Sequence, residues 1–223
     1  MCGRFTLTVD PGQLQEAFPW VDIPEEIPRR YNIAPSQPVA VVPNDGQNRV
    51  DFFNWGLIPF WAKDPKIGNR MINARSETLT EKPSFRGSFK YKRCLVLVDG
   101  FYEWRKEPGT QSKTPIYLRL KNKAPFAFAG LWDIWHSDDG SEIRTFTIIT
   151  TEPNTLIMEI HNRMPVILPQ NTYRDWLKEG ENDPDLLKSF LRPYPSEEME
   201  AFPVSRHVNN PQNDTPECII PIE

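Results

Sequence analysis

Short runs of apolar residues, rich in β-branched and aromatic side chains, recur through the first two thirds of the chain. They lie at residues 37–43, 49–55, 93–100, 115–120, 125–135 and 143–151. Such residues favour a pleated, half-buried surface, and turn-forming pieces such as the Asn-Asp-Gly at 44–46 separate the runs. We therefore predict a mostly antiparallel, barrel-like β core.

Apolar residues spaced three and four positions apart mark four short segments instead. The first is 10–18, where Asp10 is placed to cap a helix and Pro11 to open it. The others lie near the end of the chain, at 154–161, 171–179 and 184–192, with Asn171 and Asp183 as the expected N-caps of the last two. Strands first and helices after them predict an α+β fold with short flanking helices.

The size and composition favour one folded domain. The chain has 223 residues, of which 39% are hydrophobic, and its 7 Trp and 13 Phe argue against disorder. We find no repeat and no linker, so we predict a single domain over residues 1–223. The start of the chain lacks the pattern of a secretory signal, no long apolar run predicts a membrane span, and three cysteines are too few for a disulfide framework. We therefore expect a cytoplasmic protein.

Charge is unevenly distributed along the chain. The net charge of −4 gives no general attraction to nucleic acid. Residues 63–106, however, hold eleven Lys or Arg against five Asp or Glu, whereas residues 178–223 hold four against ten. Two interpretations stay open, namely ordinary solvated faces, or a basic groove for an anionic polymer with the acidic part packed on the domain or trailing it.

Cys2 is the unusual cysteine. An initiator Met before a small side chain is commonly removed, and the mature chain would then begin with a thiol and a free α-amine on one residue. The amine has an unperturbed pKa of about 8 and the thiol one of about 8.5, so a neighbouring base could activate either. Such a group can attack an acyl carbon, or condense with an aldehyde to an imine that the thiol closes to a thiazolidine. The alternative is an incidental surface cysteine.

Two titratable residues could assist Cys2. His161 follows an apolar, helix-like stretch and would titrate near neutral pH. Glu103 lies among Phe101, Tyr102 and Trp104, and burial there would raise the pKa of its carboxyl group. A structural histidine and an outward-facing strand glutamate are the alternatives.

Further motifs combine polar, basic and aromatic residues. Asn73, Arg75 and Glu77 alternate, so in an extended strand they share one face. Asn32 precedes a proline turn, and Trp61 follows a Gly-Pro loop. Aromatic residues beside cations suit single-stranded nucleic acid, because bases stack and phosphates are neutralised, although aromatic residues also fill cores.

These motifs together resemble one family. MCGRF, RYNIAP, NWGLIPFW, INARSE, DGFYEW, IHNRMP and PVSRHVNN occur in this order over nearly the whole chain. The set is similar to that of the SOS-response-associated peptidase (SRAP) family, whose members include abasic-site processing proteins also described as 5-hydroxymethylcytosine-binding proteins. The resemblance implies a single α+β domain with a DNA groove and a role in the DNA damage response.

The resemblance also implies residue roles. Cys2 would capture the aldehyde of an abasic site in single-stranded DNA as a thiazolidine crosslink that shields the lesion. Glu103 would assist sugar-ring opening, His161 would act as acid or base, and Asn73 would orient the sugar or the Cys2 terminus. The implied DNA contacts are Arg4, Asn32, Trp61, Arg75, Trp104 and Arg163.

Several functions remain open from the sequence. Capture could be accompanied by lyase chemistry through the imine and by self-cleavage before Cys2. The alternatives are a Cys-dependent peptidase using Cys2, His161 and Glu103, and a non-covalent reader of modified or single-stranded DNA. No cysteine and histidine spacing predicts a metal site and no glycine-rich loop predicts a nucleotide cofactor. We expect no cofactor, no membrane partner, a monomer, and association with the nucleoid through DNA.

Overall fold

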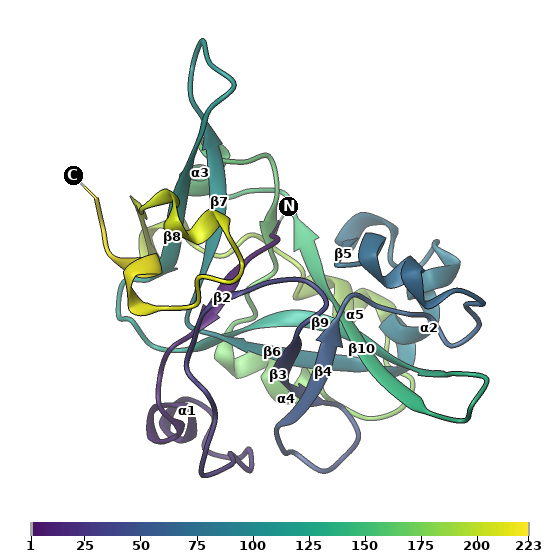
Figure 1. The fold of residues 1–223 in the computed structure, drawn as a ribbon. Helices are drawn as coiled ribbons and strands as arrows, with labels where there is room; N and C mark the ends of the chain where they lie inside the picture. Colours follow the sequence, from purple (N-terminus) through teal and green to yellow (C-terminus); the bar gives the residue numbers. More distant parts are fainter. Residues whose placement is uncertain (1, 223) are drawn as a thin grey trace.

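Two β-sheets form the framework of the protein. A computed structural model describes residues 2–222, and Figure 1 shows its ribbon. The strands are β1 (Phe5–Leu7), β2 (Arg30–Ile33), β3 (Pro38–Pro43), β4 (Asp51–Trp55), β5 (Asn73–Arg75), β6 (Arg93–Val98), β7 (Gly100–Lys106), β8 (Lys113–Leu120), β9 (Phe126–His136), β10 (Glu142–Thr151), β11 (Met164–Pro165) and β12 (Met199–Pro203).

Short helices surround the sheets. The α-helices are α1 (Pro11–Ala17), α2 (Pro83–Tyr91), α3 (Thr155–Met158), α4 (Tyr173–Trp176) and α5 (Pro184–Ser189). The 3₁₀-helices are η1 (Pro65–Arg70), η2 (Ser76–Thr78), η3 (Gln170–Thr172), η4 (Ser196–Glu198), η5 (Arg206–Asn209) and η6 (Pro216–Ile219). Within residues 2–222 no helix has the length and apolar character that crossing a membrane requires.

One sheet closes into a barrel. Its order is β10-β4-β3-β6-β9, and β9 pairs back with β10. The β10–β4 pair is parallel and the others are antiparallel, so the barrel is mixed but mostly antiparallel. Beyond the barrel, β5 and β11 both pair with the last residues of β10. The end of β10 is therefore flanked by two very short strands.

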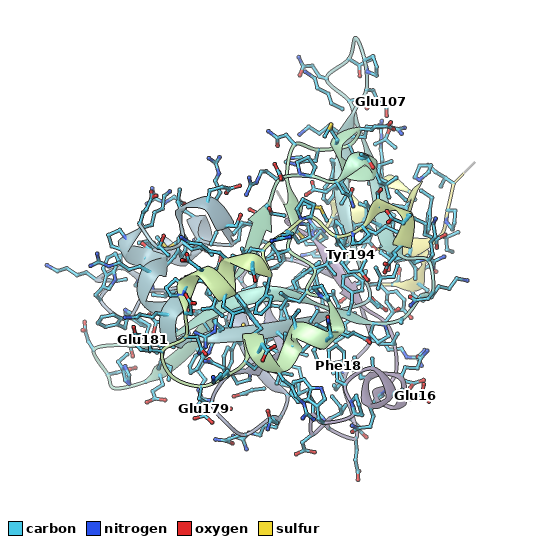
Figure 2. The ribbon with its side chains drawn as sticks, turned by 180° about the vertical axis from the view of Figure 1, so that it is seen from behind. Glu16, Phe18, Glu107, Glu179, Glu181 and Tyr194 are labelled. Atoms are coloured by element: carbon cyan, nitrogen blue, oxygen red, sulfur yellow. The ribbon has the colours of Figure 1, made fainter. Side chains whose placement is uncertain are left out.

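The other sheet carries the beginning and the end of the chain. Its order is β12-β8-β7-β1-β2. The β7–β8 hairpin lies on one side of the barrel and α2 on the other (Figure 1). Seen from behind, Glu107 lies where the turn of this hairpin begins, and the turn projects from the body (Figure 2). One apolar core contains residues from both sheets, among them Phe5 of β1 and Phe128 of β9, whose ring centroids are 6.0 Å apart.

The predicted fold class is confirmed, and most long elements lie where the sequence pattern places them. Helix α1 begins after Asp10, whose side chain accepts a hydrogen bond from Gln13 N at 3.0 Å. Asp183 caps α5 as predicted. The prediction of Asn171 as an N-cap is wrong, because Asn171 lies inside η3, and the α-helix that follows is only α4.

The basic segment 63–106 is only partly a solvent-facing surface. Arg93 is fully buried, and its guanidinium donates to the Trp176 carbonyl at 2.8 Å and to other backbone carbonyls. Burial lowers the pKa of Arg93 to about 10. Arg93 therefore stabilises the packing of α2 and α4 and is not available to an anionic ligand.

Candidate active site

Cys2 lies at the edge of the second sheet, just before β1. Strand β1 pairs with β7 through Phe5 opposite Phe101, and Tyr102 N–H donates to the Arg4 carbonyl at 3.0 Å. Continuing this antiparallel register brings Cys2 beside Glu103 and Trp104 of β7. The pairing of two strands thus brings together the predicted nucleophile and the predicted acid.

The Cys2 thiol is a protonated group in the interior. Its side chain is fully buried, and Sγ lies 3.9 Å from the Arg4 carbonyl. Burial raises the pKa of the Cys2 thiol well above its ordinary range, and the charge of Glu103 raises it further. The thiol is therefore not a preformed thiolate and needs a base when it reacts.

Glu103 is the best-placed base. It is 2% exposed, and burial raises the pKa of its carboxyl group to about 7, while the positive charge of the amino terminus opposes this rise. A carboxyl group with this pKa is present in both forms at neutral pH, so it can accept or donate a proton.

His161 is neutral and has one ring nitrogen already committed. Nδ1 lies 3.1 Å from the Arg163 backbone nitrogen and 3.3 Å from the Arg163 carbonyl oxygen, so the Arg163 backbone holds this edge of the ring. Burial lowers the pKa of His161, and the positive charge of the amino terminus lowers it further. Besides burial, the charge of Lys113 acts on both Glu103 and His161, and the charge of Glu103 acts on Cys2, so electrostatic interactions connect the three groups.

Asn73 connects the barrel to Cys2. Its Nδ2 donates to the Cys2 carbonyl at 2.8 Å. Strand β5 holds Asn73 in place, because Asn73 lies opposite Ile148 of β10. This contact fits the predicted orienting role and fixes the Cys2 backbone against the end of β10.

The end of β10 also gathers two arginines. Arg75 lies opposite Thr150 and is exposed. Arg163 donates to the Thr150 carbonyl at 2.7 Å, and its other nitrogen contacts Glu77 at 2.6 Å. Glu77 lies in η2, so the prediction that Asn73, Arg75 and Glu77 continue on one strand face is wrong beyond Arg75. The Glu77 carboxylate accepts hydrogen bonds from both terminal nitrogens of the Arg163 guanidinium. These hydrogen bonds lower the pKa of Glu77.

Asn32 makes structural contacts in this structure, and its contact with DNA stays a prediction. Its side chain is fully buried, and Nδ2 donates to the backbone carbonyls of Val208, Asn210 and Asn213 at 2.6–3.1 Å. Its Oδ1 accepts from Arg4 at 2.6 Å. Asn32 therefore ties residues 208–213 to β2, with every side-chain polar atom engaged.

Arg4 and Trp104 lie beside the hydrogen bonds that connect Asn32 to residues 208–213. The Arg4 guanidinium donates to the Val208 carbonyl at 2.8 Å and lies 5.8 Å from the Trp104 ring centroid. Trp104 is half-buried, and its indole donates to Asn209 Oδ1 at 2.8 Å. Both side chains are thus held by residues 205–213, and they border Cys2 from β1 and β7.

Trp61 lies elsewhere, in the loop between β4 and η1. It is 48% exposed, and the neighbouring Phe60 is 69% exposed. This loop is anchored to β9, where Asp133 accepts a hydrogen bond from Phe60 N–H at 2.9 Å.

Two acidic residues that sequence reasoning missed organise the site. Asp99 accepts hydrogen bonds from Thr6 Oγ1 and from Thr8 N, the latter at 2.7 Å, and so fixes β1. Asp214 pairs with Arg30 and accepts from Asn32 N at 2.8 Å, and so fixes the late segment. The only sequence signals were their positions, Asp99 directly before Gly100 and Asp214 in an Asn-rich stretch.

The described residues contain no group suited to a metal ion. Among residues 2–222, no three His, Cys, Asp or Glu side chains come close enough to hold one. The buried Cys94 and Cys218 are both free thiols. The expected removal of Met1 concerns a residue outside the described range.

Comparison with known families and proteins gives one consistent result. A family model described as SOS response associated peptidase (SRAP) matches residues 1–211. The chain is 50% identical to the abasic site processing protein YoqW of Bacillus subtilis, over 98% of this chain and 99% of that one. It is 33% identical to the abasic site processing protein HMCES of Xenopus tropicalis, over 100% of this chain and 78% of that one.

Solved structures share the fold. A crystal structure of a protein from Bacteroides thetaiotaomicron superposes with a TM-score of 0.88 at 30% identity, covering 100% of both chains. One from Bordetella bronchiseptica superposes with a TM-score of 0.79 at 26% identity, covering 92% of this chain and 100% of that one. Both the barrel and the second sheet therefore recur across these relatives.

Proposed function

Since the chain belongs to the SOS response associated peptidase (SRAP) family, we propose that it processes abasic sites in DNA, and that it does so by covalent capture through Cys2. The names of relatives at 50% and 33% identity support abasic-site processing. The observation that carries the finer proposal is the position of Cys2, which lies at the start of the chain beside a carboxyl group whose pKa is about 7.

The proposed reaction joins one aldehyde to two groups of Cys2. After Met1 is removed, the Cys2 amine adds to the aldehyde carbon of the open-chain sugar, and loss of one water gives an imine. The thiol then adds across the C=N bond, so that sulfur bonds to carbon and the thiol proton goes to nitrogen. The product is a thiazolidine, and one water is the only by-product. Holding amine and thiol on one residue gives the second step an intramolecular advantage.

The state of each group suits this order of events. A protonated thiol does not compete for the aldehyde, so the amine attacks first. Glu103 can protonate the sugar ring oxygen on opening and accept a proton from the amine, since both forms are present near pH 7. Burial lowers the pKa of His161, and a neutral imidazole can accept a proton at one ring nitrogen and donate one from the other at ring closure. Asn73 holds the Cys2 carbonyl and so limits its rotation.

The side chains that we propose as DNA contacts differ in whether they already have partners within the protein. Arg75 is exposed and free to meet a phosphate. Arg163 would have to exchange Glu77 for a phosphate, and Arg4 is engaged with the Val208 carbonyl. Trp104 would border the sugar and Trp61 would meet a base. This arrangement supports single-stranded DNA as the substrate, because base stacking needs unpaired bases.

The peptidase alternative is supported less. A cysteine peptidase needs a thiolate beside a charged imidazole, whereas here burial raises the pKa of Cys2 and lowers that of His161. The imine stage of capture would, however, permit lyase chemistry, in which elimination of the 3′ phosphate cleaves the strand before the thiol closes the ring.

The test is a denaturing gel of protein incubated with single-stranded DNA that carries one abasic site. Protein shown by mass spectrometry to lack Met1 should give a heat-stable adduct, and Cys2→Ala should give none, because both the thiol and ring closure are lost. Both proteins should still bind DNA with a tetrahydrofuran in place of the abasic sugar. The matched control is Cys94→Ala, a buried free cysteine on β6, a strand that carries none of the proposed site residues, and this variant should retain the adduct. Equal adduct from wild type and Cys2→Ala would refute capture by Cys2.

A further inference from the structure

We propose that a pocket between the loop at 59–61 and helix α2 binds one unpaired nucleobase of the strand whose abasic sugar lies at Cys2. This inference rests on the proposed function, since it takes DNA as the ligand. It adds a second site, which fixes the position of the strand along the protein.

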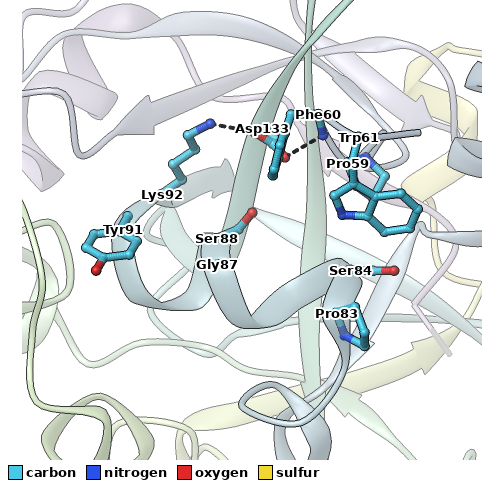
Figure 3. A pocket seen from close by; sticks show the side chains of 10 residues that line it. All are labelled: Pro59, Phe60, Trp61, Pro83, Ser84, Gly87, Ser88, Tyr91, Lys92 and Asp133. Carbon is cyan, nitrogen blue, oxygen red and sulfur yellow. Dashed lines mark hydrogen bonds and ion pairs between the residues drawn. The ribbon is translucent and has the colours of Figure 1, made fainter. Parts of the chain in front are cut away.

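The size of the pocket matches one ring system. Its volume is about 150 Å³. A cavity of this size binds benzene in an engineered protein. Figure 3 shows Phe60 and Trp61 on one side, α2 with Ser84 and Ser88 along the bottom, and Tyr91 at the other end. The full lining is Pro59, Phe60, Trp61, Pro83, Ser84, Gly87, Ser88, Tyr91, Lys92 and Asp133.

The aromatic side chains that line the pocket are unusually exposed to solvent. Phe60 is 69% exposed, Trp61 is 48% exposed and Tyr91 is 46% exposed. Large apolar side chains left in water at one place mark a binding surface. Planar rings favour a planar ligand, because stacking needs parallel faces, and Ser84 and Ser88 bring hydroxyl groups that suit the polar edge of a base.

The pocket is rigid before any ligand binds. Asp133 is 4% exposed, accepts from Phe60 N–H at 2.9 Å and pairs with Lys92 at 2.5 Å. At the base of the same loop, Gly56 and Gly68 pack backbone to backbone, since a Cβ on Gly56 would lie 2.7 Å from the Gly68 carbonyl oxygen. A preformed pocket avoids the cost of ordering a loop on binding.

The surroundings carry the charge that a nucleic acid needs. The loop and the helix expose five cations, namely Lys63, Lys66, Arg70, Lys82 and Arg86. Two exposed acids, Asp64 and Glu81, lie among them, a third, Glu181, accepts a hydrogen bond from Tyr91 and pairs with Lys90, and Asp133 is neutralised by Lys92. The excess of positive charge favours a ring attached to phosphates over an uncharged aromatic ligand.

Strand β10 connects the pocket to Cys2. Asn73, which holds Cys2, lies opposite Ile148, and Asp133, which holds Phe60, lies opposite Thr145 on the other edge of β10. Three strand residues separate these positions, roughly 10 Å along the strand. A single DNA strand whose lesion is held at Cys2 can therefore place one of its bases in the pocket. That base would lie within a few nucleotides of the lesion.

The test places 2-aminopurine, a fluorescent base, at successive positions on either side of a tetrahydrofuran lesion in single-stranded DNA. Tetrahydrofuran has no aldehyde, so the measurement does not depend on capture by Cys2. We expect quenching at one position. Phe60→Ala, which removes a wall, and Ser84→Trp, which fills the pocket, should both abolish that quenching and weaken binding about 5- to 150-fold, the range for loss of one stacked base.

The matched control is Phe52→Ala, the same change at a phenylalanine that is 44% exposed on β4 and outside the pocket, and it should bind like wild type. Quenching that persists in both pocket variants, or that is absent at every position, would overturn the proposal, and the pocket would then be open to an aromatic side chain of a protein partner. The adduct gel with Cys2→Ala reports separately on capture, so failure of one experiment leaves the other interpretable.

Discussion

Burial acts on Cys2, Glu103 and His161 in one direction, toward the uncharged form. It raises the pKa of the thiol and of the carboxyl group and lowers the pKa of the imidazole. Glu103 is the group whose pKa, about 7, lies close to cellular pH, so it sets the pH dependence that we expect.

Glu103→Gln should change both rate and stability. The raised pKa means that the folded protein binds more protons than the unfolded chain between about pH 4.5 and pH 7, so wild-type stability falls as pH rises through this window. The shift from 4.5 to about 7 corresponds to roughly 3 kcal/mol of unfolding free energy, which the glutamine variant should not lose. Urea unfolding at pH 5 and pH 8 measures the difference, and adduct formation should lose its inflection near pH 7.

The matched control is Glu16→Gln, an exposed glutamate on α1 (Figure 2). It should follow wild type in both measurements. A Glu103→Gln protein whose stability falls between pH 5 and pH 8 as steeply as that of wild type would show that Glu103 is ionised in the folded state and would remove the basis for its acid role.

At the scale of elements, the corner between β6 and β7 positions the whole amino-terminal strand. Gly100 opens β7 directly after Asp99, and a Cβ there would lie 2.1 Å from the Tyr117 hydroxyl oxygen. That hydroxyl contacts Thr6 Oγ1 at 2.9 Å, so Tyr117, Thr6 and Asp99 form one buried polar group around β1. The close approach explains why glycine occupies this position.

Gly100→Ala should therefore lower the unfolding free energy by about 1–3 kcal/mol or more, because Tyr117 must move and lose its contact with Thr6. Gly87→Ala is the same substitution in α2, where a Cβ meets no atom within 4 Å, and it should raise the unfolding free energy by up to about 1 kcal/mol. Thermal unfolding of both variants measures the effect. Equal melting temperatures would show that the corner tolerates a side chain.

The predictability of the elements follows from their length and their patterns. Strands β9 and β10 hold 11 and 10 residues, and their apolar runs identify them without reference to the rest of the chain. Strands β5 and β11 hold 3 and 2 residues and exist only because β10 offers edges to pair with. The strand predicted at 93–100 ends at Val98, because Asp99 accepts hydrogen bonds from β1 and its neighbour Thr8, and β7, which begins at Gly100, was not predicted. Helix α2 was missed, because Pro83 and Gly87 weaken its helical pattern.

At the scale of the whole molecule, the candidate site is assembled from distant parts of the chain. Motif order identified Cys2, Asn73, Glu103 and His161 as candidates, but only the pairing of β1 with β7, and of β5 and β11 with β10, brings the segments that carry them together. The structural contacts of Asn32 could not be predicted, because a buried amide that binds backbone carbonyls has the same sequence signature as one that binds a ligand. Tertiary packing decides which hydrogen-bond partners a polar side chain has, and the local sequence pattern does not contain that information.

The late acidic segment contributes to the site through one of its carboxylates. Asp214 pairs with Arg30 and accepts from Asn32 N at 2.8 Å, and Asn32 in turn holds Arg4 at 2.6 Å. This chain of contacts runs from residue 214 to the strand that carries Cys2. The segment therefore acts as a clamp on β1 and β2.

Asp214→Ala should loosen this clamp, because it leaves the Arg30 charge and the Asn32 N–H without their acceptor, a loss of about 2–3 kcal/mol of unfolding free energy. Hydrogen exchange at Tyr31 and Asn32 should speed up, and adduct formation should slow as Arg4 and Trp104 lose their restraint. Glu217→Gln removes a charge from an exposed acid three residues later and should change neither. If exchange speeds up in Asp214→Ala while the adduct rate stays at the wild-type value, the clamp stabilises the fold but does not position the reacting groups.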